Sequence, residues 1–586
     1  MTYPKIPLAQ TVIQLCKAKN IKHIIISPGS RNAPLTIGFT NDAYFKCYSI
    51  VDERSAAFFA LGIAQQLREP SAVVCTSGSA LLNYYPAVAE AFYSHIPLLV
   101  LSADRPKHLI GIGDGQTINQ KNVFENHILY SANLKLDLKD EKNIPVHEEL
   151  PILKNLEDKF ERLLGLQKDI QTFNEEEINT AINFAIVKKG PVHINIPLDE
   201  PLYETVNKLS VSPEVIDVSV KPNEIEDYIL KDCLQDWNEA SKKMILVGVN
   251  YPDTIDKKWL NELAVDDSVI VFTETTSNLH QNNFFPSIDQ IIAPLTENEQ
   301  KQLQPDILIT FGGLIVSKKI KQLLRKFKPK QHWHIDEKEA NDTFFCLNKH
   351  IETTPNEFFE GFLTKITHYV KSDYRAIWNS VKNKRLKKHE EYLSAIPFSD
   401  FMVFDKVLKT IPNNYILQVG NSSAIRYTQL FNVNKTLDVY CNRGTSGIDG
   451  STSTAIGCAV VSKKPTVFIT GDLSFLYDSN ALWNNYIPKN FRIIVVNNQG
   501  GGIFRILPGH KNTENFDTFF ETNHHHTAEY LCKMFGFKYK SVSDANSLKS
   551  ALKSFYLEDS HPKLLEIFTP KKLNDEILLQ YFEFIK

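Results

Sequence analysis

The chain has 586 residues, of which 43% are hydrophobic and 23% are charged, and its formal net charge is −3. These values are typical of a globular protein with several domains, and a nearly neutral chain has no general attraction for nucleic acid or anionic membranes. Eight cysteines are scattered without C-x-x-C pairing, which favours reduced thiols in the core. We expect no secretory signal and no membrane insertion, and therefore a cytoplasmic protein.

Strands alternate with helices through the first third of the chain. We expect helices at 8–16 and 55–67, and apolar strands at 21–26, near 51, and at 72–76, 97–102 and 190–197. Each strand ends in a polar turn, which is typical of a doubly wound parallel sheet. This pattern predicts an N-terminal domain over 1–203, with the charged stretch 134–177 as a helical excursion.

Two further α/β domains are expected after a linker at 201–222, which is rich in Pro and Ser. The middle domain, 204–372, has strands expected at 244–249, 268–273, 306–311 and 332–335. No G-x-G-x-x-G run follows a strand there, so support for nucleotide binding is weak. A charged helix at 372–391 leads into the last domain, 373–586, with strands expected near 415–419, 437–440, 466–470 and 491–496.

Oxygen-bearing residues follow the last two of these strands. Asp472 comes directly after the first, and Asn498 and Gly500 follow the second, 26 residues or more along the chain. Parallel strands joined by a helix end at one edge of a sheet, where ligands bind. Carboxylate, amide and carbonyl oxygens suit Mg²⁺, and a glycine turn before a helix supplies N–H groups for a diphosphate. From the spacing alone, an ordinary βαβ unit with polar turns explains these residues equally well.

Glu53 follows the second strand and precedes an apolar helix. A carboxyl group buried at this point would have a raised pKa and could share a proton with a ligand. An acid in the first turn of a helix is also favoured by the helix dipole alone. Taken by itself, Glu53 favours this simpler interpretation.

Several motifs together resemble one branch of the thiamine diphosphate enzymes. Gly471-Asp472 and Asn497-Asn498 have the spacing of that family's cofactor signature, with Leu473 in place of its second glycine. The branch is the 2-succinyl-5-enolpyruvyl-6-hydroxy-3-cyclohexene-1-carboxylate synthases of menaquinone biosynthesis, in which the leucine variant is a feature. The other similar runs are S-P-G-S-R-N-A-P-L (27–35), V-D-E-R-S-A-A (51–57), T-S-G-S-A (76–80), V-G-N-S-S (419–423) and N-R-G-T-S-G-I-D-G (442–450).

This resemblance implies a thiamine diphosphate cofactor and Mg²⁺, with Mn²⁺ as a possible substitute, in a homodimer or homotetramer with active sites between subunits. Asp472, Asn498 and the Gly500 carbonyl would hold the metal. Glu53 would contact the aminopyrimidine of a cofactor held by another subunit, and Ile448 would support its bent conformation. The cofactor-binding residues implied are Glu53, Asn421, Ser422, Gly447, Ile448, Gly471, Asp472, Leu473, Ser474, Asn498, Gly500, Gly501, Ile503 and Phe504.

The resemblance also implies decarboxylation of 2-oxoglutarate and addition of the resulting carbanion to isochorismate. Both substrates are dianions, so a cationic pocket is expected, and arginine suits it because its planar fork binds a carboxylate through two hydrogen bonds. The catalytic residues implied are Glu53, Ser30, Arg31, Gln116, Arg426 and Arg443. The substrate-binding residues implied are Arg31, Arg105, Gln116, Lys318, Asn421, Ser422, Arg426, Arg443, Ile503, Phe504 and Leu507. A surface charge or structural ion pair is the alternative for each basic residue, above all for Lys318 beside Lys319.

Some residues depart from the family pattern. Asn32 stands where a small hydroxyl residue is expected, and Asp114 adds a negative charge near the anion ligands. The run His524-His525-His526 predicts a polar loop, because consecutive side chains cannot all face one metal ion.

Two other functions remain open. One is a different thiamine enzyme, such as a 2-oxoacid decarboxylase or an acetolactate-type synthase, which would not need the arginines. The other is a non-catalytic or nucleotide-binding α/β protein in which these turns are structural.

Overall fold

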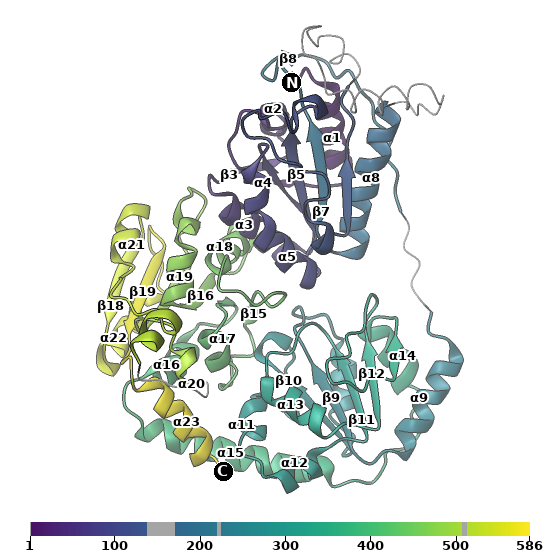
Figure 1. Ribbon diagram of the computed structural model, residues 1–586. Coiled ribbons are helices and arrows are strands. Elements are labelled where there is room, and N and C mark those ends of the chain that lie inside the picture. Colours follow the sequence, from purple (N-terminus) through teal and green to yellow (C-terminus); the bar gives the residue numbers. More distant parts are fainter. Residues whose placement is uncertain (1, 138–169, 219–223, 507–512) are drawn as a thin grey trace. The chain divides into compact units, whose positions relative to one another are not determined.

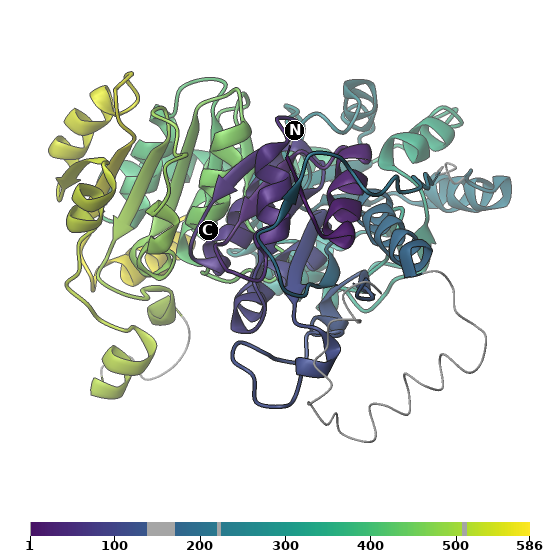
Figure 2. The same cartoon turned by 90° about the horizontal axis from the view of Figure 1, so that it is seen from above.

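The computed structural model describes residues 2–137, 170–218, 224–506 and 513–586 (Figure 1). They form two compact units. The first consists of Met1–Val220, Asp449–Lys463 and Asp478–Pro488, and the second of Lys221–Ile448, Lys464–Tyr477 and Lys489–Lys586. One parallel sheet lies in the first unit and two lie in the second, and the three are seen from above in Figure 2. The predicted fold class is therefore confirmed, while the domain boundaries at 203 and 372 stay predictions.

The first unit is built on a six-stranded sheet in the order β3-β2-β4-β5-β7-β6, with all neighbours parallel. Its strands are β2 (His23–Ile26), β3 (Lys46–Ser49), β4 (Ser71–Cys75), β5 (Leu98–Asp104), β6 (Tyr130–Asn133) and β7 (Val192–Pro197). The five predicted strands are confirmed, and β5 extends two residues further than predicted. Helices α1 (Pro7–Ala18), α2 (Ala33–Asn41) and α8 (Ile170–Lys188) share one apolar core with the sheet.

Helix α3 (Glu53–Leu67) packs on the other face of this sheet, with α4 (Ser79–Asn83) and α5 (Tyr85–Tyr93) as neighbours. It also packs closely against α18 (Ser451–Val461) within the same unit. A Cβ atom on Gly62 would lie 2.1 Å from the Thr454 carbonyl oxygen, and one on Gly457 would lie 2.0 Å from the Phe59 carbonyl oxygen. The two helix backbones therefore touch, which only glycine permits at these positions.

The middle sheet has the order β10-β9-β11-β12-β13 and is also parallel. Its strands are β9 (Lys243–Val247), β10 (Val269–Thr273), β11 (Ile307–Phe311), β12 (Gln331–Ile335) and β13 (Lys349–Ile351). One face is covered by α9 (Asp227–Glu239), α10 (Lys257–Leu263) and α14 (Pro355–Leu363). The other is covered by α11 (Ile288–Ile292), α13 (Lys318–Lys326) and α15 (Tyr374–Ala395), with α12 (Glu297–Leu303) between the first two in sequence.

The last sheet has the order β15-β14-β16-β17-β19-β18, the same succession as in the first unit. Its strands are β14 (Ile416–Val419), β15 (Asp438–Tyr440), β16 (Thr466–Gly471), β17 (Arg492–Asn497), β18 (Lys538–Val542) and β19 (Lys563–Phe568). Helices α16 (Asp400–Thr410), α17 (Ser423–Thr428), α22 (Ala545–Phe555) and α23 (Asn574–Phe584) share its main apolar core. Short helical segments α19 (Asp472–Tyr477), α20 (Ile503–Ile506) and α21 (Glu529–Phe535) lie in the loops.

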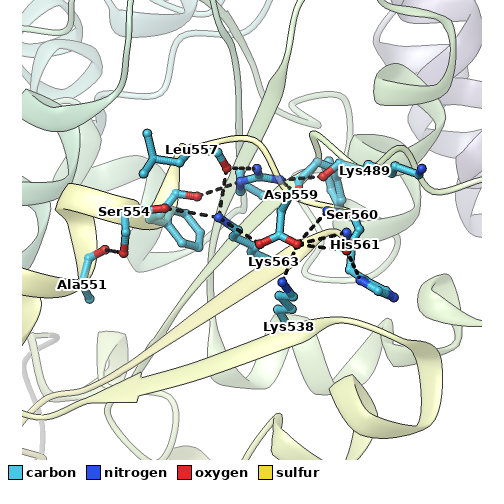
Figure 3. Close-up of polar contacts among 12 residues, drawn as sticks. Lys489, Lys538, Ala551, Ser554, Leu557, Asp559, Ser560, His561 and Lys563 are labelled. Atoms are coloured by element: carbon cyan, nitrogen blue, oxygen red, sulfur yellow. Dashed lines mark hydrogen bonds and ion pairs between the residues drawn. The ribbon is translucent and has the colours of Figure 1, made fainter.

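A cluster of charges around Asp559 fixes the far edge of this sheet (Figure 3). The Asp559 carboxylate lies 2.6 Å from the Lys538 ammonium group of β18 and 3.5 Å from that of Lys563 in β19. Lys563 also donates to the carbonyl oxygens of Ser554, in the last turn of α22, and of Leu557, just after that helix. The hydrogen bond from Lys538 holds the pKa of Asp559 below its usual range.

Of the strands in these three sheets, β6, β13, β18 and β19 were not predicted from the sequence. The expected excursion at 134–177 lies mostly outside the described residues, although α8 begins within it at Ile170. Within the part of the chain that the structure describes, no helix is long and apolar enough to span a bilayer.

Candidate active site

In each sheet the first strand in sequence has later strands on both sides, so the strand order reverses at that point. In the last sheet, this point lies between β14 and β16, and in the first sheet between β2 and β4. Open α/β sheets bind ligands at the carboxyl ends of the strands beside such a reversal. In the first sheet, the motifs 27–32 and 76–80 follow the two strands at this point. In the last sheet, the motifs 420–423 and 471–474 follow them.

Asp472 joins the ends of the two strands predicted to carry a metal. Strands β16 and β17 are parallel neighbours, as expected. The Asp472 carboxylate is buried and accepts hydrogen bonds from the backbone N–H of Leu473 at 2.7 Å and of Gly500 at 3.0 Å. The turn after β17 is thereby attached to the start of α19.

Asn498 is held by a second carboxyl group that the sequence analysis did not identify. Its Nδ2 donates to Asp400 Oδ2 at 3.0 Å, and the other oxygen of Asp400 accepts from the Thr569 hydroxyl at 2.6 Å. Burial raises the pKa of Asp400 to about 6. Because the amide nitrogen of Asn498 is engaged, its amide oxygen is left for a different partner.

Gly500 occupies a position that no larger residue fits. Its φ is 152°, and a Cβ atom would lie 2.6 Å from the Glu521 carbonyl oxygen. The Glu521 side chain, also buried, forms an ion pair with Arg505 in α20. This pair ties α20, which carries Ile503 and Phe504, to the glycine turn, whereas Leu507 lies outside the described residues.

These observations fit a magnesium ion. The site offers one carboxylate, one amide oxygen and one backbone carbonyl within a single pair of strand ends, and such hard oxygen donors suit Mg²⁺ that is also bound by phosphate oxygens. His524 is a further neighbour that the sequence analysis missed, with Nε2 at 3.2 Å from Asp472 Oδ2 and a side chain that is 7% exposed. Residues 523–527 form neither helix nor strand, as predicted for a polar loop.

Asn421 organises the turn at 442–448. Its Nδ2 donates to the carbonyl oxygens of Asn442 and Gly447, both at 2.7 Å, and its Oδ1 accepts from Arg443 Nη1 at 2.8 Å. The Ser474 hydroxyl donates to the Ile448 carbonyl oxygen at 2.8 Å. The structure thus brings together five of the predicted residues around one turn.

Ser422 has φ 66° and ψ −125°, an uncommon conformation for a residue other than glycine. Such strain is often found in functional turns, where the surrounding structure maintains it. Gln499, beside the predicted metal ligands, and Gln116 are also in the left-handed region, with φ 65° and 55°.

Two of the three basic residues predicted in the second unit have acidic neighbours. Arg443 lies within electrostatic reach of the buried Glu274, and Arg426 within reach of Asp289. Lys318 is exposed at the first residue of α13. The Nε atom of Arg443 is buried and has no hydrogen-bond acceptor among the described residues. A buried guanidinium N–H in this state is suited to an anionic ligand.

The basic residues predicted in the first unit follow β2 and β5. Arg31 is buried and donates to the Leu198 carbonyl oxygen at 3.0 Å, while its Nε has no acceptor in the described part of the chain. Arg105 donates to the Gly115 carbonyl oxygen and lies 3.2 Å from the Asp114 carboxylate. Burial lowers the pKa of Arg31, and the charge of Arg105 lowers it further.

The two departures from the family pattern thus have structural roles. Asp114 offsets the charge of Arg105, to which it is paired. Asn32 is fully buried and donates from Nδ2 to the Ser27 carbonyl oxygen at 3.0 Å. It holds the turn that carries Ser30 and Arg31, a role that a smaller hydroxyl side chain would not perform with the same reach.

Glu53 is the first residue of α3, and Asp52 is its N-cap. The Asp52 carboxylate accepts hydrogen bonds from Ser55 N at 3.0 Å and from Asn480 Nδ2 at 2.7 Å. Capping is therefore performed by Asp52. Glu53 is half-buried, with Oε2 at 3.4 Å from Asn83 Nδ2, and its role toward a cofactor stays a prediction.

Comparison with known families gives three consecutive matches. Residues 6–128 match the thiamine pyrophosphate enzyme N-terminal TPP binding domain, residues 219–387 the middle domain of thiamine pyrophosphate enzymes, and residues 418–567 their C-terminal TPP binding domain. The matches together span most of the chain. They identify the family's cofactor as thiamine diphosphate, with magnesium as its usual partner metal.

Curated relatives match over the whole chain. The chain is 56% identical to the 2-succinyl-5-enolpyruvyl-6-hydroxy-3-cyclohexene-1-carboxylate synthase of Christiangramia forsetii and 54% identical to that of Flavobacterium psychrophilum, with 100% of each chain covered. It is 34% identical to the synthase of the same name from Porphyromonas gingivalis, over 98% of this chain and 96% of the relative. The resemblance described from the motifs is confirmed. The chain belongs to the thiamine diphosphate enzyme family, in the branch of the 2-succinyl-5-enolpyruvyl-6-hydroxy-3-cyclohexene-1-carboxylate synthases.

Proposed function

We propose that this protein joins 2-oxoglutarate to isochorismate in menaquinone biosynthesis. The bond from the carboxylate to the 2-oxo carbon of 2-oxoglutarate breaks with loss of CO₂. A new carbon–carbon bond forms by 1,4-addition to isochorismate, and one proton is taken up. The product is 2-succinyl-5-enolpyruvyl-6-hydroxy-3-cyclohexene-1-carboxylate. Among the structural observations, the one that carries the proposal is the buried Arg443 Nε, which has no acceptor among the described residues, on a guanidinium group that donates from Nη1 to Asn421 Oδ1.

The proposed cofactor site uses both strand ends of the last sheet. Asp472, Asn498 and the Gly500 carbonyl would hold Mg²⁺ or Mn²⁺, and the N–H groups of the glycine turn would face the diphosphate. When bound, thiamine diphosphate supplies the nucleophilic carbon and the electron sink that decarboxylation needs. Glu53 would hold or share a proton with the aminopyrimidine ring, and Ile448 would support the ring system.

The remaining residues would bind and orient the substrates. Arg443, Arg426 and Lys318 in the second unit provide positive charge for the substrate carboxylates, as do Arg31 and Arg105 in the first. Neutral hydrogen-bond donors would be Ser30, Gln116, Asn421 and Ser422. Ile503 and Phe504 would form an apolar wall that excludes water from the reacting carbons. The active site is proposed to lie between subunits of a cytoplasmic homodimer or homotetramer.

An assay with two substrate sets tests this function. Holoenzyme with thiamine diphosphate and Mg²⁺ should release CO₂ from 2-oxoglutarate and consume isochorismate in equal amounts. Pyruvate in place of 2-oxoglutarate should support no comparable turnover. Efficient turnover of pyruvate instead would favour an acetolactate-type synthase or a decarboxylase. Failure to bind thiamine diphosphate in isothermal titration would contradict both enzyme hypotheses.

A further inference from the structure

The turn after β10, residues 274–278, carries a buried carboxyl group. Glu274 is 4% exposed, and its two oxygens accept hydrogen bonds from the backbone N–H groups of Val316 and Ser317, both at 2.7 Å. Ser317 is the N-cap of α13, and Lys318 is the first residue of that helix. Glu274 therefore determines where α13 begins and where Lys318 is displayed.

The same turn holds the segment that carries Arg426. Thr275 donates to Gln429 Oε1 from its backbone N–H at 2.9 Å and from its hydroxyl at 3.2 Å. Gln429 is the C-cap of α17, and Arg426 lies in the last turn of that helix. A displacement of the 274–278 turn would thus move the end of α17.

The third contact of the turn is with the strand that leads to Arg443. The side-chain amide of Asn278 donates to the Val439 carbonyl oxygen at 2.9 Å and accepts from the Val439 N–H at 2.8 Å. Asn278 in this way pairs with the outer edge of β15, as a neighbouring strand would. Arg443 follows β15 by three residues.

Electrostatic attraction, like these hydrogen bonds, draws the neighbouring segments toward the turn. Glu274 lies within electrostatic reach of Arg443 and of Lys321 in α13. Asp289, which accepts from the Ser317 hydroxyl, lies within reach of Arg426. Each acid thus attracts a basic group of a neighbouring segment toward the turn. The Nε of Arg443, which has no acceptor among the described residues, remains available for a ligand.

We propose that the 274–278 turn, fixed by Glu274, aligns the three basic side chains of the second unit as one binding face for a dicarboxylate. Glu274 is a positioning residue, because it acts through the segments that it holds. The inference rests on the proposed function for the identity of the dicarboxylates, 2-oxoglutarate and isochorismate. Three segments distant in sequence are held by this one turn, which the Glu274 carboxylate anchors to the start of α13.

The experiment compares Glu274→Gln with a matched control, Glu299→Gln. The first substitution keeps the shape of the side chain but turns an NH₂ group toward a backbone N–H. Glu299 also caps a helix in the second unit, where its carboxylate accepts from the Thr296 N–H at 2.7 Å, but that helix is α12. The measurements on holoenzyme are the Kd of glutarate, KM and kcat for 2-oxoglutarate, and the affinity for thiamine diphosphate with Mg²⁺.

We expect Glu274→Gln to weaken glutarate binding and raise KM for 2-oxoglutarate by about tenfold or more, as misplaced binding groups do, with a smaller change in kcat. Cofactor affinity should stay within about twofold, since the metal ligands lie elsewhere in the unit. Glu299→Gln should match wild type in every measurement. Asn278→Ala breaks a different bond of the turn and should also weaken glutarate binding. If Glu274→Gln does not fold, Asn278→Ala is the variant that tests the proposal.

The outcomes separate this inference from the proposed function. Wild type that binds glutarate but does not join 2-oxoglutarate to isochorismate contradicts the reaction only, and the variants then still test the binding face. Absence of glutarate binding in wild type overturns the inference. Unchanged glutarate affinity in a folded Glu274→Gln also overturns it, and if only Asn278→Ala folds, unchanged affinity in that variant does so. A loss of cofactor affinity equal to the loss of glutarate affinity overturns it as well.

Discussion

Asn498 donates its side-chain amide to the buried carboxylate of Asp400, at 3.0 Å from Nδ2 to Oδ2. An isolated asparagine can present either its oxygen or its nitrogen to a ligand, and here the carboxylate accepts only the nitrogen end. Asp400 itself is fixed by Thr569 and by Asn574, whose Oδ1 accepts from the Asp400 backbone N–H at 2.8 Å. The amide oxygen of Asn498 is thus oriented before any metal binds.

Asp400→Ala should therefore weaken magnesium binding. Loss of a group that orients a ligand typically costs about 10- to 100-fold in metal affinity. Titration of Mg²⁺ in the presence of thiamine diphosphate measures the effect. Asp544→Asn, at the N-cap of α22 in the same unit, is the control and should bind Mg²⁺ normally. Normal Mg²⁺ affinity in Asp400→Ala would show that Asn498 needs no such support.

Glu53→Gln should fold like wild type but turn over more slowly by about 10²- to 10⁴-fold, because general acid–base help is lost. Single-turnover kinetics and hydrogen–deuterium exchange at C2 of the cofactor measure this directly. Asp52→Asn is the neighbouring control, since asparagine also caps helices well. Turnover that survives the Glu53 change would remove this residue from the mechanism.

Arg443→Lys should raise KM for 2-oxoglutarate or isochorismate while thiamine diphosphate affinity stays similar. Lysine keeps the charge but lacks the planar fork and the Nε donor. Arg325→Lys, in α13 with its guanidinium bonded to the Thr343 carbonyl oxygen, is the control and should leave both constants unchanged. A loss of cofactor affinity with normal substrate constants would mean that Arg443 serves the cofactor instead.

Gly500→Ala and Gly471→Ala should differ in stability, although both glycines belong to the predicted cofactor site. A Cβ atom on Gly500 would collide with Glu521, whereas one on Gly471 meets nothing within 4 Å among the described residues. Strain of this kind costs about 1–3 kcal/mol, so Gly500→Ala should lower the unfolding free energy and Gly471→Ala should change it little. Chemical denaturation of the metal-free protein measures both. Equal stability of the two variants would contradict the tight contact with Glu521.

Buried histidines should make the protein less stable in acid. Burial lowers the pKa of His332 to about 4, and its Nε2 lies 2.9 Å from the Thr310 hydroxyl. Since the pKa is lower in the folded state than its ordinary value of about 6.5, the stabilising contribution is present above 6.5 and lost as pH falls toward 4.

Variants at this histidine test the pH effect. His332→Gln, which cannot gain a proton, should reduce the loss of unfolding free energy between pH 7.5 and 5 by an amount on the order of 2 kcal/mol. The exposed His368→Gln is the control. Parallel pH profiles for wild type and His332→Gln would assign the acid sensitivity to other groups.

The strand–helix alternation was predictable from the sequence because most strands of a covered parallel sheet are buried on both faces. They appear as continuous apolar runs such as 98–101 in β5. Two of the edge strands that were not predicted lack this signal: β13 has three residues, and β18 is largely exposed. The sixth strand β19 is a buried run that the periodicity does indicate, and it could have been predicted.

The candidate metal ligands could also be predicted from the sequence. Asp472, Asn498 and Gly500 flank one βαβ unit, and the chain itself determines that both strand ends reach the same edge. The residues that orient them could not be predicted from the sequence. Asp400 lies 98 positions from Asn498, and Glu274 lies 43 positions from Ser317, the N-cap of the helix whose start it fixes. Sequence periodicity describes which side of a strand or helix is buried. Only tertiary packing decides which distant carboxylate contacts which amide, because those contacts depend on how separate elements pack around a common core.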